Sequence, residues 1–104
     1  MALLQLTTIP LGTGTPSIAS YVAEIQRELE NSQLPFRLND MGTVIEGNIS
    51  ELLAVIDKIY EIPFNKGAVR VVTQIVIDDR RDKKVCIGDK IAAVKHTLRH
   101  QQGE

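Results

Sequence analysis

The order in which apolar periodicity changes along the chain most constrains its fold. Short apolar or alternating runs, typical of strands, occupy residues 3–9, 36–39, 43–46 and 69–77. Apolar residues at helical spacing separate them at 16–31 and between Ser50 and Pro63, and follow the last strand from Asp89. The order β-α-β-β-α-β predicts the α+β, ferredoxin-like sandwich, an antiparallel four-stranded sheet with two helices on one face. The segment from Asp89 adds an extra C-terminal helix.

Helix boundaries follow from a few residues. Thr15 is expected to cap the first helix, with Pro16 at its first position, Ser50 to cap the second, and Pro63 to end it. The inner stripes are expected at Ile18, Val22, Ile25 and Leu29, then at Leu52, Ile56 and Ile59, and in the last helix at Ile91, Val94 and Leu98.

Composition excludes several classes of protein. The 104 residues are enough for one domain, residues 1–104, with a single core. A formal charge of −1 and only four aromatic residues argue against nucleic-acid binding. The single cysteine, Cys86, cannot form an intramolecular disulfide, and no signal peptide or membrane-spanning stretch is recognisable. We therefore expect a cytoplasmic protein without nucleic-acid or membrane partners.

The second face of the predicted sheet lacks a cover. Val72 and Val76 lie on the face that the first two helices leave open, so the last helix or another subunit should cover it. Arg80 and Arg81 lie in the adjacent charged loop, residues 78–83. They either form local ion pairs or grip carboxylates of a neighbour. These four residues are the predicted oligomer interface.

Polar connections mark the candidate binding residues. The segment 12–15, Gly-Thr-Gly-Thr, could present N–H groups to an anion or simply allow a tight turn. Thr7 and Thr8 could complete a polar pocket or be ordinary strand residues. His96 and His100 are spaced to share a metal or merely decorate a basic helix end. No nucleophile–base pair or metal set is evident, so we expect no enzyme.

Four segments together resemble the small thiamine-binding protein family, the YkoF-like group. They are residues 9–17 (IPLGTGTPS), 41–47 (MGTVIEG), 70–73 (RVVT) and 77–83 (IDDRRDK). The resemblance implies a ferredoxin-like fold, homodimers that pair into homotetramers, and no catalytic activity or cofactor. It also implies that thiamine, or its hydroxymethyl-pyrimidine part, is the bound ligand.

The resemblance also implies where that ligand binds. The implied pocket residues are Pro10, Gly12, Thr15, Ser17, Met41 and Thr43, and we hypothesise that Glu46 joins them. Thr43 would hydrogen-bond the pyrimidine edge, and Asp40 or Glu46 would favour the thiazolium cation. Strand alternation places Glu46 on the face opposite Thr43, so both serve one pocket only if the strand twists or bulges.

Two functions remain open at the level of sequence. The first is a non-catalytic cytoplasmic binding protein that buffers, transports or senses thiamine or its pyrimidine. The alternative is an oligomeric scaffold or regulatory protein whose subunit interface carries the function.

Overall fold

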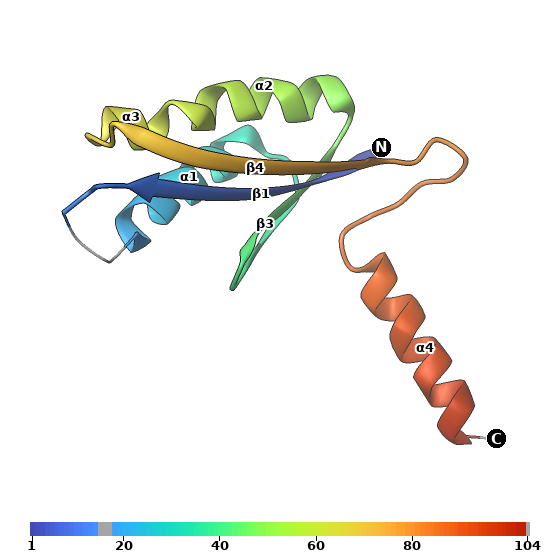
Figure 1. Cartoon of the computed structure of the whole chain (residues 1–104). Coiled ribbons are helices and arrows are strands. Elements are labelled where there is room, and N and C mark those ends of the chain that lie inside the picture. Colours follow the sequence, from blue (N-terminus) through green and yellow to red (C-terminus); the bar gives the residue numbers. More distant parts are fainter. Residues whose placement is uncertain (15–17, 104) are drawn as a thin grey trace.

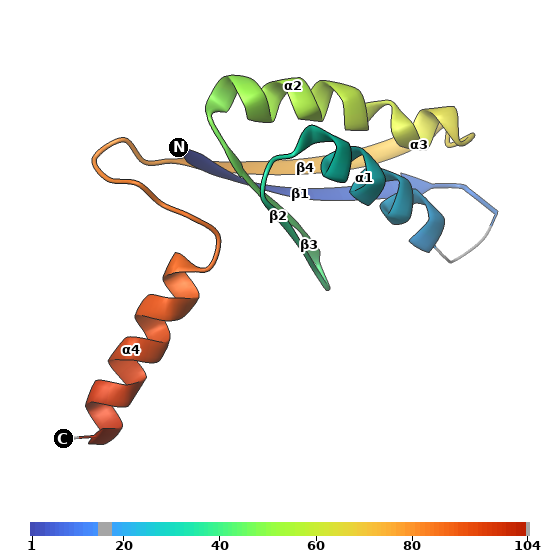
Figure 2. The same cartoon turned by 180° about the vertical axis from the view of Figure 1, so that it is seen from behind.

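The computed structural model describes residues 1–14 and 18–103 of the chain. Figures 1 and 2 show the arrangement of the elements from opposite sides. In chain order they are β1 (Ala2–Leu11), α1 (Ala19–Ser32), β2 (Phe36–Asn39), β3 (Gly42–Gly47), α2 (Ile49–Tyr60), α3 (Ile62–Asn65), β4 (Arg70–Asp79) and α4 (Asp89–Gly103).

The four strands form one antiparallel sheet in the order β2-β3-β1-β4. Leu4 of β1 pairs with Ile45 of β3 on one side and Ile77 of β4 on the other. The first strand is therefore central and β4 is an edge strand. The predicted α+β, ferredoxin-like fold with an added C-terminal helix is confirmed.

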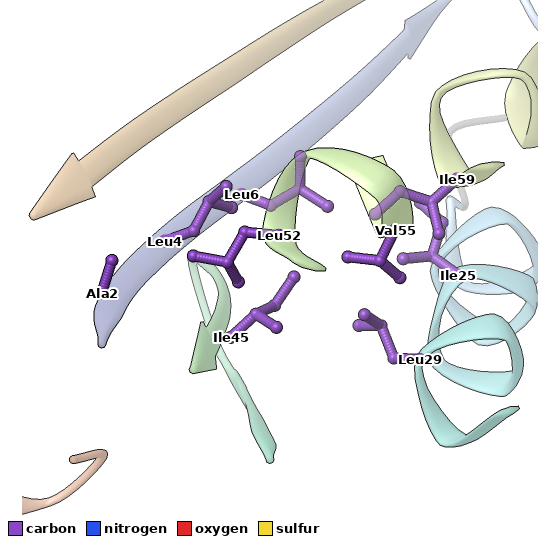
Figure 3. Close-up of a cluster of buried hydrophobic side chains, with 9 residues drawn as sticks. All are labelled: Ala2, Leu4, Leu6, Ile25, Leu29, Ile45, Leu52, Val55 and Ile59. Carbon is purple, nitrogen blue, oxygen red and sulfur yellow. The ribbon is translucent and has the colours of Figure 1, made fainter. Parts of the chain in front are cut away.

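The core lies between one face of the sheet and the helices α1 and α2. Because side chains alternate along a strand, β1 presents its even-numbered residues to this face. Figure 3 shows the buried side chains of β1, β3, α1 and α2 converging on one another. The cluster contains Ala2, Leu4, Leu6, Ile25, Leu29, Ile45, Leu52, Val55 and Ile59.

The helix boundaries correct part of the sequence prediction. Asn48, not Ser50, caps α2, and its backbone N–H donates to the Glu51 carboxylate at 3.0 Å in a capping box. Pro63 does not end α2. It lies in the first turn of the separate helix α3, where its missing N–H has no cost. The predicted cap Thr15 and Pro16 lie outside the described residues, and α1 begins at Ala19.

The other face of the sheet, which we call the open face, is not covered by α1 or α2. It carries the odd-numbered side chains of β1 and the even-numbered side chains of β4 that pair with them. Helix α4 extends away from the body on the side of the sheet opposite α2 (Figure 1). No helix in the described part of the chain is long and apolar enough to cross a membrane.

Candidate binding cavity

A cavity of about 310 Å³ lies between the second half of β1, the first half of α1 and the β2–β3 turn. We call it the β1–α1 cavity. Its described lining residues are Leu6, Thr7, Thr8, Ile9, Ile18, Val22, Ile25, Gln26, Leu38, Asn39, Asp40, Met41, Gly42 and Thr43. The volume is at the lower end of the range of roughly 300–1,000 Å³ for small-molecule sites.

The walls of the cavity are mainly apolar, and one hydrogen-bonded pair supplies polar groups. The Gln26 side-chain amide donates to the Thr43 hydroxyl oxygen at 3.1 Å. Thr43 is only 4 % exposed. The bond uses one amide donor, so the chemistry of the pair still offers an amide carbonyl acceptor and a hydroxyl donor. Such a pair matches a ligand edge with an acceptor next to a donor.

The β2–β3 turn approaches β1 closely because residue 42 is glycine. A Cβ built on Gly42 would lie 2.9 Å from the Leu6 carbonyl oxygen and 3.0 Å from Thr7 Oγ1. That hydroxyl donates to the Met41 carbonyl oxygen at 3.1 Å and ties the turn to β1. The close approach places Met41 on the cavity wall with its side chain 85 % exposed.

The charge of the cavity is negative. Among its described lining residues, Asp40 is the only ionisable one. Since α1, β1 and the turn contribute no cation among these residues, a positively charged ligand group would be favoured beside Asp40. An anionic ligand would be disfavoured.

The structure brings together only some of the residues predicted for the pocket. Met41 and Thr43 line the cavity, as do Thr7 and Thr8. Pro10 is buried and Gly12 lies in the exposed loop beyond β1; neither is among the described lining residues. Thr15 and Ser17 lie outside the described residues.

Glu46 does not lie in the cavity. The regular β3 strand places it on the face opposite Thr43, and no bulge brings it back. There Glu46 is 8 % exposed, and its Oε1 accepts the backbone N–H of Ile87 at 2.8 Å. Its carboxylate therefore anchors the segment before α4 instead of facing a ligand.

The charged loop after β4 forms ion pairs within the chain. Arg80 holds Asp82 through two hydrogen bonds of 2.6 and 2.9 Å, and Arg81 contacts Asp79 at 2.8 Å. The hydrogen bonds from the arginines lower the pKa of both carboxyl groups below the ordinary value. Of the two alternatives for this loop, the structure therefore has the local ion pairs, and each of the two guanidinium groups has a carboxylate partner within the chain.

Sequence reasoning missed Gln26 and misassigned the start of the α1 stripe. Ile18 and Val22 are not core residues; they line the cavity, while Tyr21 is buried in their place. Tyr21 also lies under Lys66, whose Nζ is 5.7 Å from the ring centroid. The apolar spacing was correct, but it could not distinguish a cavity wall from a core.

In the described part of the chain, no group of three or more His, Cys, Asp or Glu side chains is placed to hold a metal ion. The rings of His96 and His100 lie 4.1 Å apart, and His100 Nδ1 contacts the His96 carbonyl oxygen at 3.1 Å.

The fold and the cavity define a small ferredoxin-like α+β domain with a mainly apolar cavity beside a central strand. A sequence model of the family described as "Thiamine-binding protein" matches residues 4–95, and the chain belongs to this family.

Similar proteins come from distant organisms. UPF0045 protein YqgV of Bacillus subtilis is 49 % identical over 102 residues, covering 94 % of this chain and 98 % of that protein. A UPF0045 protein of Methanothermobacter thermautotrophicus is 35 % identical, covering 94 % and 100 %.

Solved structures share the fold. A hypothetical protein from Methanocaldococcus jannaschii aligns with a TM-score of 0.81 at 32 % identity, covering 90 % of this chain and 95 % of that one. A Thermotoga maritima protein, named as a candidate for thiamine biosynthesis or salvage, aligns with a TM-score of 0.75 at 14 % identity, covering 89 % and 97 %. The latter likeness concerns the fold alone.

Proposed function

We propose that this chain is a non-catalytic protein that binds thiamine, or its hydroxymethyl-pyrimidine part, in the β1–α1 cavity. The observation that carries the proposal is the Gln26–Thr43 pair within mainly apolar walls. An aminopyrimidine edge presents a ring-nitrogen acceptor beside an amino donor, and the Thr43 hydroxyl and Gln26 carbonyl complement it. The name of the matching family supports the choice of ligand.

The other lining residues of the cavity complement the other parts of the thiamine molecule. Leu6, Val22 and Ile25 supply apolar surface for a flat ring, and Asp40 supplies a negative charge for a thiazolium cation. Binding without chemistry is consistent with a role in buffering, transporting or sensing the vitamin.

Calorimetric titration with thiamine and with hydroxymethyl-pyrimidine tests this proposal. Replacing Thr43 by Val removes the hydroxyl with little change in shape, so binding should weaken about tenfold to a hundredfold, equivalent to about 1–3 kcal/mol. Thr73→Val is the matched control, since Thr73 lies on β4 of the same sheet and is not among the described lining residues of the cavity.

The possible results separate the ligand from the site. Equal affinity of the parent and Thr43→Val would place the ligand elsewhere. No binding of either compound to the parent would reject thiamine and leave the scaffold or regulatory function as the better explanation.

A further inference from the structure

Helix α4 carries both histidines of the chain, His96 and His100, on one side of its C-terminal half. Residues four apart on a helix are neighbours, with Cβ atoms roughly 5–6 Å apart. The two ring centroids are 4.1 Å apart, and both side chains are exposed. Because α4 projects away from the sheet (Figures 1 and 2), the histidine pair is accessible to solutes.

A hydrogen bond orients one of the two rings. His100 Nδ1 lies 3.1 Å from the His96 carbonyl oxygen. A carbonyl oxygen only accepts, so the Nδ1–H group donates, and the neutral ring then carries its lone pair on Nε2. Histidines that bind metal ions are typically held in this way, with the second ring nitrogen donating to a carbonyl or a carboxylate. His100 therefore has the tautomer of a metal ligand.

The separation of the two rings suits a single metal ion. An imidazole nitrogen binds Zn²⁺ at about 2.0–2.1 Å, so two such nitrogen atoms in a tetrahedral site are roughly 3.4 Å apart. Rings whose centroids are 4.1 Å apart can reach this nitrogen spacing by small side-chain rotations.

The charges around the pair determine which cations can bind. His96 lines a groove between α4 and β2 together with Arg37, Lys95 and Arg99, and the described lining residues of this groove include no acid. These three cations repel a metal ion that is attracted by charge alone, such as Mg²⁺. A metal ion that prefers imidazole instead gains two bonds to ring nitrogen atoms, and the C-terminal end of the helix dipole favours its charge. Ligand chemistry therefore selects the ion.

We propose that His96 and His100 form a two-histidine site for a divalent transition metal ion that prefers imidazole, of which Zn²⁺ is representative. The described part of the chain contains no group of three or more possible ligands, so water or an outside donor fills the other coordination positions. The bound ion joins successive turns of α4 and stabilises this end of the helix. The site does not depend on the ligand of the β1–α1 cavity.

Calorimetric titration of the full chain with Zn²⁺ tests the site, and Mg²⁺ is the comparison ion. The parent should bind one Zn²⁺ per chain and no Mg²⁺. His96→Gln should lower the Zn²⁺ affinity by about tenfold or more, since the loss of even a supporting group near a metal has an effect of this size.

A double variant, His100→Gln with Gln101→His, is the matched control. It keeps the composition and the charge of the chain, but a spacing of five residues places the two rings on different sides of the helix. Its Zn²⁺ affinity should fall as far as that of His96→Gln.

Amide hydrogen exchange locates the metal independently of its affinity. If opening of the last turns of α4 releases the ion, protection rises by the factor 1 + [Zn²⁺]/Kd, or about elevenfold at a free Zn²⁺ concentration of ten times Kd. We expect this slowing for the amides of residues 97–101 in the parent, and not in the double variant at the same Zn²⁺ concentration.

Four results would overturn the proposal. Equal Zn²⁺ affinity of the parent and the double variant would place the metal elsewhere, for example at Cys86, which every variant retains. Mg²⁺ binding as strong as Zn²⁺ binding would mean attraction by charge without imidazole ligands. Zn²⁺ binding that leaves exchange in α4 unchanged, or no Zn²⁺ binding to the parent, would mean that the two rings do not form a metal site.

Discussion

At the scale of single residues, Gly42 decides whether the cavity keeps its shape. The turn reaches β1 only because no Cβ separates residue 42 from the Leu6 carbonyl and the Thr7 hydroxyl. Backbone atoms of β1 cannot give way as the end of a flexible side chain could. One missing methyl group thus positions Met41 and the start of β3.

Gly42→Ala is expected to destabilise the fold by about 1–3 kcal/mol, because the turn must move away from β1. Urea unfolding measures the loss. Gly47→Ala on the same strand is the control: its Cβ would meet only side-chain atoms of Leu34, Leu52 and Glu51 at 3.4–3.6 Å, so a change below about 1 kcal/mol is expected. Equal losses for the two variants would contradict the special role of Gly42.

At the scale of elements, the start of α2 depends on Asn48. In the capping box the Asn48 side chain accepts the backbone N–H of Glu51, and the Asn48 backbone N–H donates to the Glu51 carboxylate, at the point where β3 ends and the chain turns back over the sheet. Alanine at position 48 removes the first of these two bonds. Asn48→Ala should cost about 1 kcal/mol, or roughly 4–8 °C in Tm. Ser50→Ala, one residue inside the helix, should leave Tm almost unchanged in the same scanning calorimetry. A larger decrease in Tm for Ser50→Ala than for Asn48→Ala would indicate that Ser50 caps α2, as the sequence predicted.

The elements show which inferences sequence allows. The order of strands and helices and the start of α4 at Asp89 were predicted, because alternation, helical spacing and capping residues are local signals. The separate helix α3 was missed, since Pro63 reads equally well as an end or as a first helical position.

The candidate site was only half predictable. The family resemblance placed Met41 and Thr43 in the pocket, and both line the cavity. Gln26 could not be predicted, because only packing shows which helix residue meets Thr43. For Glu46, strand alternation correctly indicated the face opposite Thr43. Its hydrogen-bond partner there could not be predicted, because Ile87 is 41 residues away in the sequence.

At the scale of the whole molecule, charge is divided unevenly: residues 1–79 carry a formal charge of −5 and residues 80–104 a formal charge of +4. The association of copies predicted from the sequence is therefore expected to be sensitive to salt. Screening shortens the range of electrostatic attraction from about 10 Å at 0.1 M to about 3 Å at 1 M ionic strength. Sedimentation equilibrium at these two ionic strengths should show a higher dissociation constant at high salt. An unchanged or lower constant would mean that apolar contact alone drives assembly, and that the charge asymmetry of −5 against +4 has no part in it.

The position of Glu46 has a mechanical consequence. Thr43 and Glu46 are three residues apart on β3, about 10 Å along the strand, and they project from its opposite faces. One side chain forms part of the cavity wall, and the other holds the base of α4. The strand β3 therefore connects two parts of the molecule, the β1–α1 cavity and the base of α4. If β3 tilted or shifted within the sheet, the wall of the β1–α1 cavity and the base of α4 would move together. The far end of α4 would then be displaced as well.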